Sequence, residues 1–194
     1  MSIDHRPRDS ASTDAAVPVT ERSTARRRAL ARSAAWIAVA LYAAQFAVGA
    51  AAALGGFDID DHAQGLGAAS EGLGGLAFVA GAVALAVLAP RGARLAAWLP
   101  AVIGLGASGG TMAWVAATGI EPPVELFLAE VSLTAIGLVV VGVLGALRRR
   151  VWPWWVGIAV ALLIPVMFLV PANSIPLALA WTAVALTARP VGRS

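Results

Sequence analysis

The sequence predicts an all-α membrane protein, a bundle of six transmembrane helices with both termini in the cytoplasm. Hydrophobic residues make up 59% of its 194 residues and charged residues only 13%. A soluble protein of this composition would expose large apolar patches and aggregate. The apolar residues instead fall into blocks, most of them near the roughly 20 residues that a helix needs to cross a bilayer. These observations predict the fold class, and the distribution of arginine predicts its orientation.

Six apolar blocks account for the six predicted helices, and the shortest lies at the C-terminal end. The blocks cover about residues 34–54, 72–89, 97–117, 124–147, 154–170 and 175–188. The first is longer than the core of a cleaved signal peptide, so we expect a retained helix. The last rises only about 21 Å, which predicts a shallow position or local thinning of the bilayer. Pro171 and Pro176 bracket the turn that joins the last two blocks into a hairpin.

Two cytoplasmic tails flank the predicted transmembrane domain. Residues 1–30 are polar and rich in Ser, Thr, Arg and Asp, without apolar periodicity, which predicts a disordered basic tail. The transmembrane domain covers 31–189, and residues 190–194 form a second, short tail. Arginines at the end of the long tail attract anionic lipid headgroups at roughly 1 kcal/mol per basic residue. The expected partners are therefore the lipid bilayer and the anionic lipids of its cytoplasmic face.

Arginine marks alternate connections of the predicted bundle. Besides the N-terminal tail, the groups are Arg91 and Arg94, Arg148 to Arg150, and Arg189 and Arg193. The intervening loops contain no arginine, so the positive-inside rule places both termini in the cytoplasm of a multi-pass protein of the cell membrane. The absence of lysine, together with heavy use of alanine, glycine and valine, indicates a bacterial genome rich in GC.

Glu130 is the most informative single residue, because it lies inside the fourth apolar block. If the helix starts near Val124, Glu130 is about six residues, or roughly 9 Å, along its axis. Ionisable groups at such depth are costly and face the bundle interior or a water-filled cavity. Thr134 continues the same helix face, and Gln45, near the middle of the first block, is a second polar group that needs a partner.

Glu71 stands on the same predicted side of the membrane as Glu130, at the mouth of the second helix. One interpretation is a helix-capping acid, since the macrodipole favours a carboxylate there by about 0.3–1 kcal/mol. Another places Glu71 with Glu130, Gln45 and Thr134 around an outward-opening polar cavity, where two carboxylates exchange a proton or hold a cationic substrate. Interhelical hydrogen bonding is the structural alternative to such a cavity.

The loop sequence DIDDH is a candidate weak cation site, with Asp58, Asp60, Asp61 and His62 as its ligands. An EF-hand counted from Asp58 would need glycine at its sixth position and glutamate at its twelfth, and alanine stands at both. A zinc site would need more nitrogen or sulfur ligands than His62 alone. An ordinary solvated loop is the other interpretation, and neither a metal centre nor a cofactor is expected.

Gly106 and Gly110 stand at the GxxxG spacing that lets two membrane helices pack closely, so we expect them at a helix interface. The segment Gly106 to Gly109 also resembles the GxSG nucleophile motif of the rhomboid-type intramembrane proteases, which have six core helices. The resemblance covers these four residues and would make Ser108 the nucleophile. That family's pattern requires a histidine base in a later helix, and no histidine follows His62. We therefore expect no protease activity.

Basic and aromatic residues gather between the fourth and fifth blocks. They are Arg148, Arg149, Arg150, Trp152, Trp154 and Trp155. Arginine and tryptophan at the inner end of two helices are typical of anchors at the membrane interface, which explains the cluster without a nucleic-acid partner.

Two functions are compatible with these features, and neither requires catalysis. The sequence lacks cysteine, the HExxH zinc motif and a phosphate-binding glycine loop, which predicts a non-enzymatic protein. The acids near the outer side favour a small transporter or permease-like protein. The abundance of small residues favours instead a non-catalytic membrane subunit that binds a membrane protein partner or forms a homo-oligomer.

Overall fold

The computed structural model describes residues 19–57, 61–62, 64–147 and 151–189, and all regular elements in these ranges are helical. Four helices are long and apolar enough to cross a membrane. They are α1 (Val19–Gly55), α2 (Gly65–Leu88), α3 (Leu99–Thr118) and α4 (Val124–Ala146). The shorter helices are η1 (Gly92–Ala97), α5 (Trp154–Ala161), α6 (Leu163–Leu169) and α7 (Ser174–Thr187). Predictions for residues 1–18, Asp58, Asp60, Arg148, Arg149, Arg150 and 190–194 fall outside the described ranges.

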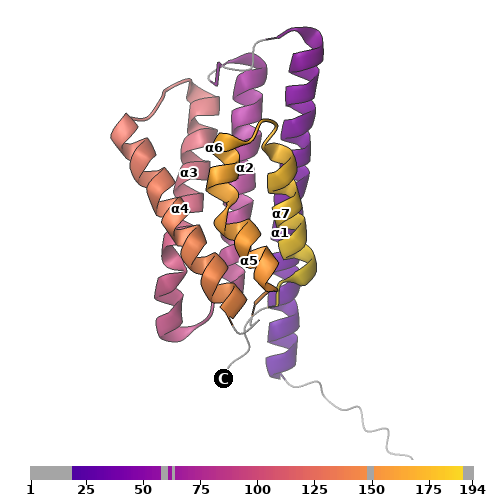
Figure 1. Cartoon of the computed structure of the whole chain (residues 1–194), viewed down its shortest axis with the longest axis vertical. Helices are drawn as coiled ribbons and strands as arrows, with labels where there is room; N and C mark the ends of the chain where they lie inside the picture. Colours follow the sequence, from indigo (N-terminus) through magenta and orange to yellow (C-terminus); the bar gives the residue numbers. More distant parts are fainter. Residues whose placement is uncertain (1–18, 58–60, 63, 148–150, 190–194) are drawn as a thin grey trace, which may run out of the picture.

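The helices form one elongated bundle (Figure 1). α1 packs on α2, α2 on α3, α3 on α4 and α4 on α5, while α7 returns beside α1 and closes the bundle. α5 and α6 follow one another in the same direction, and α7 runs back along them. Trp181 of α7 is fully buried, and its ring fills the space beside Gly81 of α2. The last helix is therefore part of the core.

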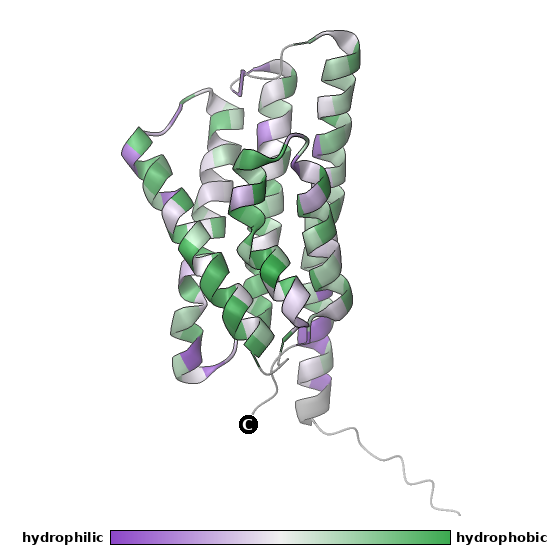
Figure 2. Cartoon of the chain, viewed as in Figure 1, coloured by the Kyte–Doolittle hydropathy of each residue, from purple (hydrophilic) through white to green (hydrophobic). Residues whose placement is uncertain are grey.

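Charged side chains lie towards the two ends of the bundle, and its middle is mostly apolar (Figure 2). Arg27, Arg32, Arg91, Arg94 and Arg189 lie at one end, called the arginine end below. Asp61, Glu71, Glu121, Glu125 and Glu130 lie towards the other, called the acidic end. Such a separation is typical of a bundle whose apolar middle is covered by hydrocarbon.

α1 begins at Val19, whereas the sequence predicted disorder to residue 30 and a helix from about residue 34. Residues 19–30 are thus helical in the structure. Alanine, arginine and glutamate have high helix propensity, and a helix that is already nucleated extends at little cost. The helix that forms in the apolar part of α1 therefore extends towards the N-terminus through the polar segment.

Arg27, in this extension, and Arg32, just after it, form hydrogen bonds to the ends of two other helices. The Arg27 guanidinium Nη2 donates to the carbonyl oxygens of Val87 (2.6 Å) and Ala89 (2.9 Å) at the end of α2. Arg32 Nε donates to the carbonyl oxygen of Ala185 in the last turn of α7 (2.9 Å). The last carbonyls of a helix lack intrahelical donors, and the macrodipole favours a cation there. These two arginines, predicted to attract lipid headgroups, therefore also cap helices.

A break at Leu162 separates α5 from α6, where the sequence predicted one helix over about residues 154–170. Pro165 explains the break, because proline has no N–H to donate to the carbonyl of Ala161 and its ring crowds that carbonyl. The two pieces have 8 and 7 residues, so neither is long enough to cross a bilayer alone.

Glycine brings α2 and α3 into backbone contact at Gly75 and Gly109. A Cβ added to Gly75 would lie 2.6 Å from the carbonyl oxygen of Gly109, and one added to Gly109 would lie 2.5 Å from that of Gly75. The pair predicted from the sequence, Gly106 and Gly110, does not form such a close contact. A Cβ on Gly110 would meet nothing within 4 Å, and one on Gly106 would only touch Ala82 at 4.0 Å. The face of α3 that meets α2 carries Gly109, which is about 100° around the helix from Gly110.

Trp152 was predicted to anchor the chain at the membrane interface, together with Trp154 and Trp155. Its side chain is instead 2% exposed. It stacks against Trp98 with ring centroids 5.7 Å apart and fills the space beside Gly145. The missing Cβ of Gly145 leaves room for the indole, so this tryptophan belongs to the core. Trp154 and Trp155 are exposed, as an interface role requires.

Candidate functional site

Glu71 and Glu130 occupy equivalent depths on two helices. α2 begins at Gly65 rather than near residue 72, and α4 begins at Val124 as predicted. Each carboxylate therefore lies about 9 Å along the axis from its helix start. The first turn of α2 contains no acidic residue. Glu71 is consequently inside the helix and does not cap its N-terminus.

Hydrogen bonds hold Glu130 between α3 and α4. Thr111 Oγ1 donates to Glu130 Oε1 at 2.9 Å. Thr134 Oγ1 donates to the backbone carbonyl of Glu130 at 2.7 Å and lies 3.2 Å from Ser108 Oγ. Because the Thr134 hydroxyl has a single hydrogen, Ser108 is the donor in the second pair. Two of these bonds join α3 to α4, as the interhelical interpretation requires.

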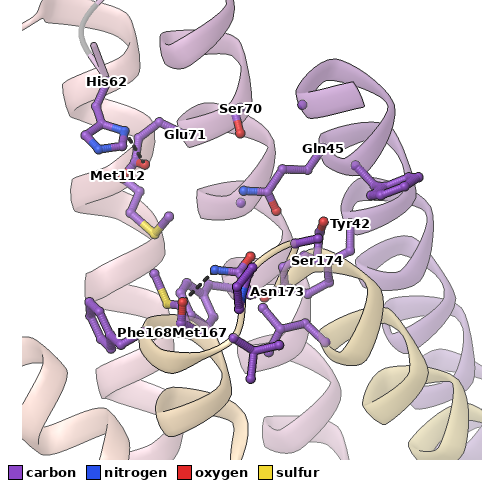
Figure 3. A pocket seen from close by; sticks show the side chains of 18 of the residues that line it. Tyr42, Gln45, His62, Ser70, Glu71, Met112, Met167, Phe168, Asn173 and Ser174 are labelled. Carbon is purple, nitrogen blue, oxygen red and sulfur yellow. Dashed lines mark hydrogen bonds and ion pairs between the residues drawn. The ribbon is translucent and has the colours of Figure 1, made fainter. Parts of the chain in front are cut away.

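His62 reaches from the loop before α2 to Glu71 (Figure 3). Its Nδ1 lies 3.5 Å from Glu71 Oε2, and the two form an ion pair when the imidazole is protonated. The imidazole is largely exposed, whereas the Glu71 side chain is only 22% exposed. The sequence grouped His62 with the neighbouring aspartates as a weak cation site. Among the described residues, no three His, Cys, Asp or Glu side chains are arranged to hold a metal ion.

A cavity of about 290 Å³ at the acidic end, called the acidic cavity below, is lined by both Glu71 and Glu130. Glu121 adds a third carboxylate, and His62 lies at its edge. The remaining walls are largely apolar and include Phe78, Met112, Val115, Phe127, Ile164 and Met167. Three carboxylates against one imidazole give this space a negative electrostatic potential.

A second cavity of about 970 Å³, called the large cavity below, adjoins the acidic cavity. The two share His62, Glu71, Phe78, Met112, Phe127 and Met167 as lining residues. Figure 3 shows Gln45 projecting from α1 towards the space that Glu71 borders from α2. Gln45 Oε1 is buried and has no hydrogen-bond partner among the residues that the structure describes. A buried acceptor without a donor is costly in apolar surroundings, so it marks a place where a donor group or water would bind.

The structure brings together three of the four polar residues that the sequence singled out. Glu71 and Glu130 line the acidic cavity, and Gln45 and Glu71 line the large one. Thr134 is fully buried, and its hydroxyl donates a hydrogen bond to the backbone carbonyl of Glu130.

Sequence reasoning missed two groups of lining residues. Thr111, which holds the Glu130 carboxylate, could have been found from its spacing of three residues after Ser108, which places both hydroxyls on one face of α3. Met112, Phe127 and Met167 carry no such signal, because an apolar side chain in an apolar helix looks the same whether it faces lipid or a cavity.

The walls suit a soft organic ligand better than a bare ion. Aromatic faces attract organic cations, and methionine adapts its shape to irregular apolar ligands. Hard inorganic cations such as Ca²⁺ take six to eight oxygen ligands around one point, and no three acidic or histidine side chains of the described residues are grouped in that way. The arrangement therefore favours a cation with an apolar body.

Comparison of the chain with known protein families, with curated proteins and with solved structures finds no match.

Proposed function

We propose that this chain is a membrane protein of six transmembrane segments with both termini in the cytoplasm, and that it acts as a small permease-like protein. In this proposal α5 and α6 together form the fifth segment and α7 forms the sixth. The positive-inside rule supports the orientation, because the arginine end then faces the cytoplasm and the acidic end faces outwards. The solute is a small cation that binds between Glu71 and Glu130.

One observation carries the proposal: Glu71 and Glu130 line the same cavity at equivalent helix depths. Carboxylates below a membrane surface are costly unless they face a polar space or a partner. Glu130 has one donor, Thr111, for Oε1, and Glu71 faces an imidazole at 3.5 Å. A bound cation would complete the neutralisation of both carboxylates. No step in this activity calls for a catalytic group, a metal or a cofactor.

The test is uptake of small radiolabelled amines and guanidinium compounds by proteoliposomes that contain the purified protein. Glu130→Gln keeps the size and the hydrogen bond to Thr111 but removes the charge, and it should abolish flux while the protein remains folded. Glu125→Gln is the matched control, since Glu125 is exposed on the same helix. Equal flux in the wild type and in Glu130→Gln would refute the proposal.

A non-catalytic subunit is the second candidate, and a groove between α4 and α5 favours it. Gly142, Ala146, Gly157 and Ala161 line this space of about 670 Å³. Gly142 and Gly157 already pack α4 against α5, so the surface that another membrane helix would meet is the exposed apolar rim of this groove, which includes Trp154 and Ile158. Pull-down from mild detergent, followed by mass determination of the intact complex, tests this function. A chain that is monomeric and recovers no partner, in a preparation that transports cations, would exclude it.

A further inference from the structure

A groove of about 550 Å³ runs between α3 and α4 and leads to Glu130. Gly106, Ala107, Gly110, Trp114, Ile120 and Leu126 line it, together with Glu130 itself. Trp114, Ile120 and Leu126 are all exposed, so most of the rim of the groove is apolar, with the exposed Glu121 at one end of it. In a bilayer, such a rim contacts lipid and not water.

Glu130 borders this groove and the acidic cavity at the same time. Thr111, Glu121 and Pro122 also line both spaces. The Glu130 carboxylate thus stands at the boundary between a lipid-facing surface and an interior site. A ligand in the groove would reach this carboxylate before it reached Glu71, which lines the acidic cavity and the large cavity but not the groove.

Gly106 and Gly110 keep the groove open. A Cβ on Gly110 would meet nothing within 4 Å, and one on Gly106 would meet only Ala82 at 4.0 Å. The GxxxG spacing therefore makes no close helix contact within the described part of the chain. Instead, the two missing side chains leave room beside the path to Glu130.

We propose that the ligand is a lipophilic organic cation that reaches Glu130 laterally from the membrane through the groove between α3 and α4. This inference rests on the cation-binding function proposed above and adds the ligand class and its route. A lipophilic cation partitions into the outer half of the bilayer, where it meets the apolar side chains of the rim and the carboxylates of Glu121 and Glu130. Its apolar body then fits the Phe78, Met112 and Phe127 wall behind.

The experiment measures binding of two cations to the protein in nanodiscs. Tetraphenylphosphonium partitions into membranes, whereas tetramethylammonium stays in water. Gly110→Leu fills the groove, and Ala117→Leu, an exposed position elsewhere on α3, is its matched control. A route changes association and dissociation rates together and leaves the equilibrium dissociation constant unaltered, so both rates and Kd are recorded by stopped-flow tryptophan fluorescence.

Gly110→Leu should slow association of tetraphenylphosphonium by about tenfold, or about 1.4 kcal/mol in the barrier. Its Kd and the association rate of tetramethylammonium should stay as in the wild type, and Ala117→Leu should change neither. If Gly110→Leu unfolds the protein, the smaller Gly110→Val replaces it, with a smaller slowing expected.

Two results would overturn the lateral route while leaving the binding site intact. The first is an unchanged association rate for tetraphenylphosphonium in Gly110→Leu. The second is an equal rise in Kd for both cations, that is, an equal loss of affinity, which would mean that the groove belongs to the binding site. Failure of the proposed function looks different, because in that case neither cation binds the wild type, or Glu130→Gln binds both as well as the wild type does.

Discussion

Gly75 and Gly109 pack so closely that the backbone of α2 touches that of α3. This contact fixes the distance between the helix that carries Glu71 and the helix that carries Thr111, the donor to Glu130. The dimensions of the acidic cavity therefore depend on a contact between two residues without side chains.

Replacing Gly109 by valine should lower the free energy of unfolding by about 1–3 kcal/mol, because the added methyl groups collide with the Gly75 carbonyl. Thermal unfolding in detergent measures the loss. Gly110→Ala is the control, since its Cβ meets nothing within 4 Å and should leave the melting temperature unchanged or slightly raised. Equal melting temperatures for Gly109→Val and the wild type would contradict the contact.

Arg27→Met should destabilise the protein by about 1–2 kcal/mol, because it removes two hydrogen bonds to the carbonyls that end α2. Methionine keeps most of the aliphatic stem. Arg26→Met alters an exposed neighbour and should change stability by less than about 0.5 kcal/mol. Urea unfolding in mild detergent compares the two. A similar effect of both substitutions would show that the loss of charge, and not the helix cap, matters.

Thr134→Val should cost about 1 kcal/mol, because the Ser108 hydroxyl loses its acceptor and the Glu130 carbonyl loses a donor. The side chain keeps its size, so packing is little changed. Thr182→Val removes a hydroxyl that bonds only to the carbonyl of Ala178 in its own helix, and its effect should be smaller. The melting temperatures of both variants are compared. A larger drop in melting temperature for Thr182→Val would argue against the Ser108–Thr134 hydrogen bond between α3 and α4.

Trp152→Ala should lower stability by about 3–5 kcal/mol, as expected for a large buried aromatic residue. Trp154→Ala changes a side chain that is 61% exposed and should leave the melting temperature in detergent nearly unaltered. An equally mild effect of both substitutions would mean that Trp152 contacts solvent or lipid, as the sequence first suggested.

The sequence predicted α4 well and α2 poorly, for a physical reason. Two consecutive prolines precede Val124 and fix the start of α4, so the depth of Glu130 was correct. The first turns of α2 consist of Gly, Ala, Ser and Leu, whose mixed hydropathy hides the helix, so Glu71 was placed at its mouth. The break before Pro165 could have been predicted from the proline itself, whereas the burial of Trp152 depends on contacts that hydropathy does not record.

The candidate site was predictable in its polar part only. A carboxylate in an apolar block stands out in any sequence, which is why Glu130 was found. The methionine and phenylalanine walls are assembled from α2, α3, α4 and α6, and the open groove at Gly110 arises from the way α3 and α4 face each other. No local pattern distinguishes a glycine at a close contact, such as Gly109, from a glycine beside empty space.

The short hairpin of α6 and α7 stops well below the upper ends of α1 and α2 (Figure 1), and its turn lines the large cavity. α7 has 14 residues and is therefore about 21 Å long, against a hydrocarbon thickness of about 30 Å. Where water fills the space above the turn, the membrane voltage falls across the shorter, dry part of the bundle alone. The voltage drop, about 2.3 kcal/mol per unit charge and 100 mV, is thereby concentrated between the cavity floor and the arginine end. In the proposed orientation, a charge that leaves the site towards the arginine end would cross nearly all of this voltage, and one that reaches the site from the acidic end would cross almost none.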